Sequence, residues 1–287
     1  MNSNNSSKLA IPDPIRVNGG STAKVYSNSL TSNSSSTLAG GDAIEVASNN
    51  NAEIYSNTLT SNSSSKLATA DAIRLNGGNT GKVYSNTLSS NSSSTLAGAN
   101  GINVLGNDNA DIYSNNLTSN SSSKLAVGDA IRASGSKNLD IYSNSLTSKG
   151  SSDLAGGHGI NVQLGGLGGS YDAEINNNTL ISETTSQLAA LDGIRVEGGK
   201  NAKVHDNVLT AKTTFLGGST LAGANGINVI NNSDALVQAN TLTADTSTLG
   251  GVSRIAANGD GIRVTGSSKA QVLGNVLRSN GVSQVAT

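Results

Sequence analysis

Apolar and polar residues alternate in short runs along this chain. Ile44, Glu45 and Val46 form one apolar–polar–apolar run, residues 52–54 form a second, and Leu59 opens a third. Alternation with period two, interrupted by Asn and Gly clusters, predicts strands separated by turns. The runs are too short for helices and are rich in Val, Ile, Thr, Ser and Asn, which have low helix propensity. We therefore predict three short strands in this part of the chain.

The three-strand pattern recurs along the whole chain. The isoleucine of the first strand falls at Ile15, Ile44, Ile73, Ile102, Ile131, Ile160, Ile194, Ile227 and Ile262. Subtracting neighbours gives a spacing of 29 five times, then 34, 33 and 35. An internal period of this length predicts a solenoid, propeller or array. Because the register never resets, we expect one continuous domain over residues 1–287.

Stacked copies of this unit predict a parallel β-solenoid of about nine three-stranded coils. Strands stacked about 4.8 Å apart would form three parallel sheets around a narrow core. The second strand would fill that core with Val25, Ile54, Val83, Ile112, Ile141, Ile175, Val204, Val237 and Val272. The third would fill it with Leu30, Leu59, Leu88, Leu117, Leu146, Leu180, Leu209, Leu242 and Leu277. Medium-sized aliphatics suit such a core, in agreement with an aromatic content of 2%.

An unbroken asparagine column precedes the leucine column. It consists of Asn28, Asn57, Asn86, Asn115, Asn144, Asn178, Asn207, Asn240 and Asn275. Asn tolerates the left-handed backbone conformation of a turn, and stacked amides can hydrogen-bond from one copy to the next. We predict a structural asparagine ladder here.

Two short sequence motifs within the repeat resemble those of a known family. Asp192-Gly193-Ile194-Arg195-Val196, followed by the x-A-x-V-x-x-N-x-L phrase of residues 201–209, is similar to the repeat of the pectate-lyase-like superfamily. The resemblance covers the whole chain and implies an all-β, right-handed parallel β-helix with an asparagine ladder. That fold hosts lyases, hydrolases, epimerases, phage tailspikes and adhesins, so the resemblance does not select a function.

A finer period runs through the outward positions of the first strand. The residue after each isoleucine is Arg16, Glu45, Arg74, Asn103, Arg132, Asn161, Arg195, Asn228 and Arg263. The residue two before it is Asp13, Asp42, Asp71, Asn100, Asp129, His158, Asp192, Asn225 and Asp260. Alternation from the third copy onward spaces like charges further apart, which favours a structural interpretation. The alternative is a charged stripe that meets a partner or binds Ca²⁺; no other cofactor or metal is expected.

Two outward stripes are candidate binding surfaces. The first is a column of Tyr26, Tyr55, Tyr84, Tyr113 and Tyr142, which could hold a sugar chain or another protein, or simply stabilise the sheet. The second is Ser-Asn-Ser-Ser-Ser, at 32–36, 61–65, 90–94 and 119–123. It could bind water or glycans or carry glycosylation at its N-x-S sequons, or reflect repeat duplication alone.

The sixth copy departs from the repeat at Gly157-His158-Gly159. His158 would lie between Asp129 and Asp192, whose carboxylates, two copies apart, would be about 9.6 Å from each other, near the upper limit for an inverting glycosidase. Gly-His-Gly resembles a polygalacturonase motif, but the family's Asp-Asp pair, N-T-D and R-I-K are missing. Asp129, His158 and Asp192 are therefore the catalytic alternative to an expected non-enzymatic protein, in which His158 replaces an Asn of the column.

Composition narrows the function classes. Eighteen Lys and Arg against 19 Asp and Glu, a net charge of -1 and the lack of a basic run argue against nucleic acid as a partner. The absence of Cys excludes disulfides and thiolate chemistry. We expect no membrane span and see no signal peptide in Met1–Ser7. Abundant Ser, Thr, Asn and Gly favour an extracellular or cell-surface location.

Solenoids usually carry capping elements at both ends, and we see none here. Met1 aligns with the Leu30 column, and the chain closes with a third strand at 277–285. We therefore expect either head-to-tail self-association or a fragment of a longer chain, in a filament, adhesin or surface fibre. The alternative function is a polysaccharide-binding or polysaccharide-degrading protein of the lyase, hydrolase or epimerase kind.

Overall fold

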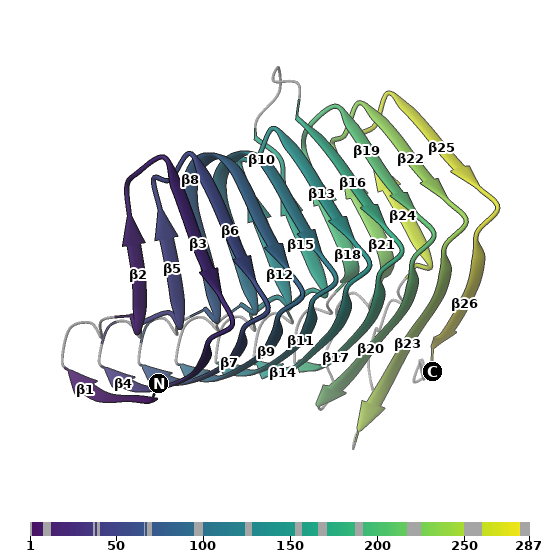
Figure 1. Cartoon of the computed structure of the whole chain (residues 1–287). Helices are drawn as coiled ribbons and strands as arrows, with labels where there is room; N and C mark the ends of the chain where they lie inside the picture. The colour runs from purple at the N-terminus through teal and green to yellow at the C-terminus, as the bar shows by residue number, and fades with distance from the viewer. Residues whose placement is uncertain are drawn as a thin grey trace.

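The computed structural model describes residues 2–7, 13–36, 38, 41–65, 67, 71–94, 100–123, 128–152, 157–165, 171–186, 192–216, 225–249 and 260–281. Every regular element in these residues is a β-strand, and the strands stack in parallel into a solenoid (Figure 1). The predicted all-β solenoid is confirmed. No helix in this part of the chain is long and apolar enough to span a membrane.

The strands form three walls. The first wall contains β2 (Ile15–Asn18), β5 (Ile44–Ala47), β12 (Ile131–Ser134), β15 (Ile160–Gln163), β18 (Asp192–Glu197), β21 (Asn225–Ile230) and β24 (Ile262–Thr265). The second contains β3 (Thr22–Tyr26), β6 (Asn51–Tyr55), β13 (Asn138–Tyr142), β16 (Asp172–Asn176), β19 (Asn201–His205), β22 (Asp234–Gln238) and β25 (Lys269–Leu273). Two longer strands, β8 (Ile73–Tyr84) and β10 (Ile102–Tyr113), run through both walls.

The third wall is a 10-stranded sheet of its own. It contains β1 (Asn2–Ser7), β4 (Ser29–Ser36), β7 (Thr58–Ser65), β9 (Thr87–Ser94), β11 (Asn116–Ser123), β14 (Ser145–Ser152), β17 (Thr179–Ser186), β20 (Val208–Leu216), β23 (Thr241–Leu249) and β26 (Val276–Gly281). The first two walls form one 16-stranded sheet, because β8 and β10 join them. The expectation of three separate sheets was therefore wrong.

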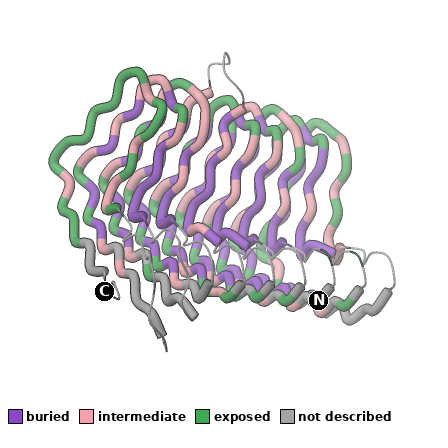
Figure 2. Tube along the Cα trace, turned by 180° about the vertical axis from the view of Figure 1, so that it is seen from behind, coloured by how far each residue is buried: buried purple, intermediate pink, exposed green. Residues whose placement is uncertain are grey.

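Strand register follows the repeat. Ile15 pairs with Ile44 in the first wall, and Leu30 pairs with Leu59 in the third. In the second to eighth copies the aliphatic columns point inward and are buried, as the purple stripes in Figure 2 show. Aliphatic side chains at the same position of successive copies stack on one another and fill the core without aromatic residues.

The expected count of about nine three-stranded coils needs correction. The third and fourth copies have one continuous strand, β8 or β10, in place of two. In the first copy Ile15 and Val17 are only half-buried, and in the ninth Val272 and Leu277 are exposed. Copies that have three separate strands around a closed core are therefore fewer than nine, and closer to six.

The asparagine ladder is present. The backbone N–H and Nδ2 of Asn86 both donate to Oδ1 of Asn115, at 3.1 and 2.9 Å, and Nδ2 of Asn86 also donates to the carbonyl oxygen of Ile54. The same donation to the next asparagine runs from Asn28 to Asn275. Each buried amide is therefore satisfied by its neighbours.

The left-handed turn residue is not the asparagine itself, as we had expected, but the residue before it. Ser27, Ser56, Ser85, Ser114 and Ser143 have φ between 54° and 56°. This conformation turns the chain from the second wall to the third. The asparagine side chain is thereby directed into the buried corner, where its hydrogen bonds stabilise the turn.

Candidate functional site

The five tyrosines form one continuous stack. Neighbouring ring centroids are 4.9 to 5.0 Å apart and the ring planes are within 5° of parallel, from Tyr26 to Tyr142. Tyr26 is 52% exposed and the other four are half-buried. Burial, followed by neighbouring charged or phenolic groups, raises the pKa of Tyr84, Tyr113 and Tyr142. The row presents ring edges and hydroxyls to solvent.

This geometry limits what the tyrosine row can bind. A sugar that stacks on an aromatic side chain needs an open ring face, but both faces of Tyr55, Tyr84 and Tyr113 are turned toward neighbouring rings. Only the outer face of each terminal ring is free of this stack. The predicted binding surface therefore offers edges and hydroxyls along its length, which is a different chemistry from a sugar-stacking platform.

A second ladder runs along the corner before the first wall, in the column that we interpreted as structural from the sequence but whose hydrogen bonds we did not predict. Its members are Asp13, Asp42, Asp71, Asn100, Asp129, His158, Asp192, Asn225 and Asp260, and we call it the carboxylate ladder. In most steps the backbone N–H of one member donates to the side chain of the member before it, as from Asp71 to Asp42 at 2.7 Å. Asn225 reaches Asp192 through Nδ2 instead.

Side-chain amides explain the two-copy alternation. Oδ2 of Asp71 accepts a hydrogen bond from Asn103, at 2.7 Å, although burial raises the pKa of Asp71. Asn161 donates to Asp129 in the same way, and Asn228 donates to Asp192, both at 2.9 Å. From the third copy onward, a copy with a buried Asp is thus followed by a copy that supplies an Asn to it. The alternation has a hydrogen-bonding basis in addition to the spacing of charges.

His158 occupies a place in this ladder. Its backbone N–H donates to Oδ1 of Asp129, at 2.6 Å, and its Nδ1 accepts from the backbone N–H of Asp192, at 2.9 Å. The ring therefore performs the acceptor role that Asn100 has two copies earlier. Since the oxygens of Asp129 and Asp192 also accept ladder bonds, the three residues come together as a hydrogen-bonded structural unit.

Replacing His158 with asparagine is expected to change the free energy of unfolding by only a few tenths of a kcal/mol, because the acceptor is kept. Replacing it with alanine should cost about 1–3 kcal/mol, because the N–H of Asp192 loses its acceptor. Urea denaturation of both variants checks this. Equal losses in the two variants would show that the ring has a role that an amide cannot take over.

The second copy breaks the alternation with two carboxylates. Asp42 and Glu45 stand where the fourth copy has Asn100 and Asn103. Together with Asp13 they place three carboxylate oxygens within 4.8 Å of one another, which among the described residues is the arrangement able to hold a cation such as Ca²⁺. Positive charge is already near, because Arg16 pairs with Glu45 at 3.0 Å and Arg74 with Asp42 at 3.8 Å. Burial, then the hydrogen bond and repulsion from Glu45, raises the pKa of Asp13 to about 7.

Stability of this corner is expected to fall as pH rises. The folded-state pKa of Asp13 lies above its ordinary value of 3.8, so its contribution is fully present below about pH 4 and is lost as pH passes through about 7. The pKa of Asp42 is raised as well, mainly by burial, with the same sign. Thermal melts should therefore give a lower Tm at pH 8 than at pH 5. Glu45→Gln should flatten this dependence, and a higher Tm at pH 8 in the wild type would contradict the assignment.

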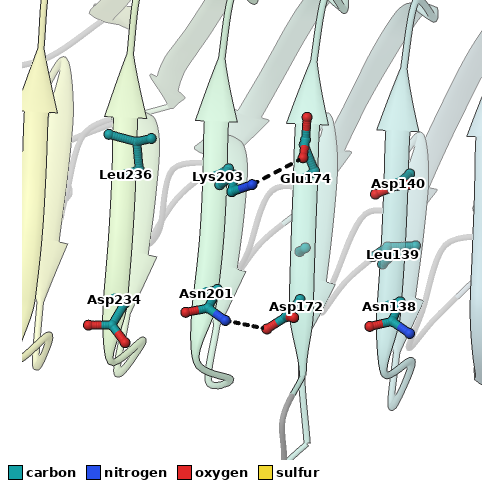
Figure 3. Close-up of a pocket in the computed structure, with 10 residues that line it drawn as sticks. Asn138, Leu139, Asp140, Asp172, Glu174, Asn201, Lys203, Asp234 and Leu236 are labelled. Carbon is teal, nitrogen blue, oxygen red and sulfur yellow. Dashed lines mark hydrogen bonds and ion pairs between the residues drawn. The ribbon is translucent and has the colours of Figure 1, made fainter.

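The second wall carries a hollow beyond the last tyrosine. It lies on the outward face of β13, β16, β19 and β22 (Figure 3). Carboxylates predominate in it, from Asp140, Asp172, Glu174 and Asp234, with Lys203 3.6 Å from Glu174. In the tyrosine column itself, His205 bridges Asp206, at 2.8 Å, and Glu174, at 3.2 Å. Glu174 is thus engaged with Lys203 and His205, and Asp172 accepts a hydrogen bond from Asn201.

The serine-rich stripe is only partly an outward surface. The first serine of each motif is buried, at Ser32, Ser61, Ser90 and Ser119. The next residue points outward, and Asn33, Asn62, Asn91 and Asn120 form a third ladder through bonds of 2.8 to 3.0 Å. The sequon asparagines are thus hydrogen-bonded to each other in the folded chain.

Comparison of the chain with protein-family models, with curated proteins and with solved structures finds no match.

Proposed function

We propose that this protein is a structural β-solenoid that associates head to tail into a filament or surface fibre. The observation that carries the proposal is the last described copy. Val272 and Leu277 are each 48% exposed, whereas their register partners in the eighth copy, Val237 and Leu242, are at most 1% exposed. Within the described residues, β24, β25 and β26 pair only with strands of the eighth copy, so this apolar face is bordered by open strand edges and is a template for another β-strand layer.

The first copy of a second molecule supplies a matching layer. The first and ninth copies carry the same aliphatic residue at each inward position of the repeat. Each would therefore pack against an identical side chain across the junction: Ile15 against Ile262, Val17 against Val264, Val25 against Val272 and Leu30 against Leu277. In the described structure Oδ1 of Asn28 accepts no hydrogen bond and the N–H of Asn275 donates none, so the asparagine ladder can continue across the junction.

The junction requires one strand to move. β1 lies beside β4, and β26 of the preceding molecule would occupy the same position in the third wall. The incoming molecule therefore has to release β1 before its first and second walls can pair. We expect association to be slow for this reason, and faster when residues 2–7 are deleted.

The finer assignments belong to the same proposal. Strand-turn phrases and the asparagine ladder support a place in the right-handed, pectate-lyase-like superfamily, among its non-enzymatic fibres and adhesins. A polar, hydroxyl-rich surface supports an extracellular or cell-surface location. The polysaccharide-degrading alternative has less support, because the ladder already uses the carboxylate oxygens of Asp129 and Asp192.

Sedimentation velocity and electron microscopy over an about hundredfold range of concentration test the proposal. We expect rods whose length grows with concentration. Val272→Asp should abolish growth without unfolding the chain, because this side chain is already exposed. Ser268→Asp, on a neighbouring exposed turn, is the matched control and should leave growth unchanged. Short rods of one molecule at every concentration would overturn the proposal.

A further inference from the structure

The tyrosine row and the outward column beside it border a strip of the second wall, which we call the channel. Its five rings extend over roughly 20 Å parallel to the solenoid axis. The next outward column lies two residues earlier in each strand, about 7 Å away along the strand. That column consists of Lys24, Glu53, Lys82, Asp111 and Asp140. The space between two such columns is wide enough for a flat aromatic molecule about one ring thick.

In the column beside the tyrosines, four of the five charged side chains form ion pairs with described residues and the fifth does not. Lys24 pairs with Glu53, at 3.1 Å, and Lys82 pairs with Asp111, at 3.8 Å. In the part of the chain that the structure describes, Asp140 has no cation within ion-pair distance. Its neighbours in the column are Asp111 and Glu174. One exposed carboxylate without a direct ion pair therefore stands beside Tyr142, at one end of the row.

The exposed ring edges favour a flat aromatic ligand. An aromatic ring is electropositive at its edge and electronegative on its face, so a second ring is held best when its face meets that edge. A flat ligand that runs along the channel would meet five edges in succession. A rigid ligand loses little conformational freedom on binding, which favours it over a flexible chain.

We propose that this channel binds an elongated, planar aromatic cation that lies along the solenoid axis with its charged end at Asp140. Burial and the flanking carboxylates of Asp111 and Glu174 raise the pKa of Asp140, and the charge of Lys203 lowers it. A cationic ligand end beside Asp140 would offset the repulsion among these carboxylates. The ridge of hydroxyls provides hydrogen-bond partners for polar atoms on the ligand edge.

Thioflavin T, a planar benzothiazolium cation, is a suitable probe. It is titrated into protein that size-exclusion chromatography shows to be a single molecule, so that filaments do not contribute to the fluorescence. We expect enhanced fluorescence with one saturable site and weaker binding at higher salt. Absence of enhancement with the folded wild type would overturn the proposal.

Variants locate the site. Tyr84→Ser divides the row into two pairs of rings and should weaken binding at least about tenfold, whereas Tyr26→Ser leaves four consecutive rings and should have a small effect. Asp140→Asn, at an exposed position, should weaken binding about threefold and remove part of the salt dependence. Ser268→Asp is again the matched control. Unchanged affinity in folded Tyr84→Ser or in Asp140→Asn would contradict the assignment, and neither result depends on head-to-tail association.

Discussion

Asn115→Ala is expected to lower the free energy of unfolding by about 3 kcal/mol or more. The side chain accepts two hydrogen bonds from Asn86, and its Nδ2 donates to Asn144 and to the carbonyl oxygen of Val83. Alanine removes these bonds and leaves buried donors and an acceptor without partners. An unsatisfied buried group costs about 1–3 kcal/mol, more than the net gain from one hydrogen bond. Urea denaturation followed by circular dichroism measures the loss.

Asn28→Ala is the matched control. Asn28 has the same place in the first copy, but within the described part of the chain its Oδ1 accepts no hydrogen bond, and the residue is half-buried. We expect a loss of about 1 kcal/mol. Equal losses for Asn115→Ala and Asn28→Ala would show that the stacked amides are not mutually dependent and that the ladder contributes only local turn bonds.

Gly78→Ala is expected to have a comparable or larger effect. Gly78 has φ of 118°, a conformation that L-residues avoid, and a Cβ added there would overlap the backbone carbonyl oxygen of Asn49 in the copy before. The overlap is with backbone, so β8 would have to move away from its neighbour. We expect a loss of more than about 3 kcal/mol, because strain of the backbone adds to the steric overlap.

Gly77→Ala separates the two causes. Gly77 also has a positive φ, of 71°, but a Cβ at this position has nothing within 4 Å. Backbone conformation alone should cost about 1–2 kcal/mol. Thermal and urea denaturation of both variants give the comparison, and a loss at Gly77 as large as that at Gly78 would contradict the role of the close approach to Asn49.

Sequence periodicity was sufficient for the parts of the fold that depend on spacing. Ile44, Ile54 and Leu59 identify inward columns because side chains alternate along a strand, and the repeat then sets the register of every neighbour. The asparagine ladder followed from the same reasoning, since its residue type does not change from Asn28 to Asn275.

Periodicity located the column of the carboxylate ladder but could not predict its hydrogen bonds. Its members include Asp, Asn and His, and their common property is an acceptor atom directed at one backbone N–H, which depends on side-chain geometry. The useful signal was the pairing of Asp71 with Asn103 and of Asp129 with Asn161, each 32 residues apart. We had attributed this alternation to charge repulsion, although it also reflects hydrogen-bond donation.

The orientation of the tyrosine rings and the continuity of β8 and β10 could not be predicted from the periodicity either. The tyrosine column was evident from Tyr26 to Tyr142, but whether its rings expose faces or edges depends on side-chain rotamers that a one-letter pattern does not contain. Likewise, the turns of the third and fourth copies have enough ladder bonds for β8 and β10 to continue as single strands, as between Asn107 and Gly78.

The asparagine ladder and the carboxylate ladder donate their hydrogen bonds in opposite directions along the solenoid axis. In the asparagine ladder each copy donates toward the C-terminal copy, as Asn86 does to Asn115. In the carboxylate ladder the backbone donates toward the N-terminal copy, as Asp71 does to Asp42. Aligned hydrogen bonds polarise one another and add their dipoles, so two parallel ladders would build up a field with length. Opposed ladders cancel much of that field, and adding copies to this solenoid therefore carries little cumulative electrostatic penalty.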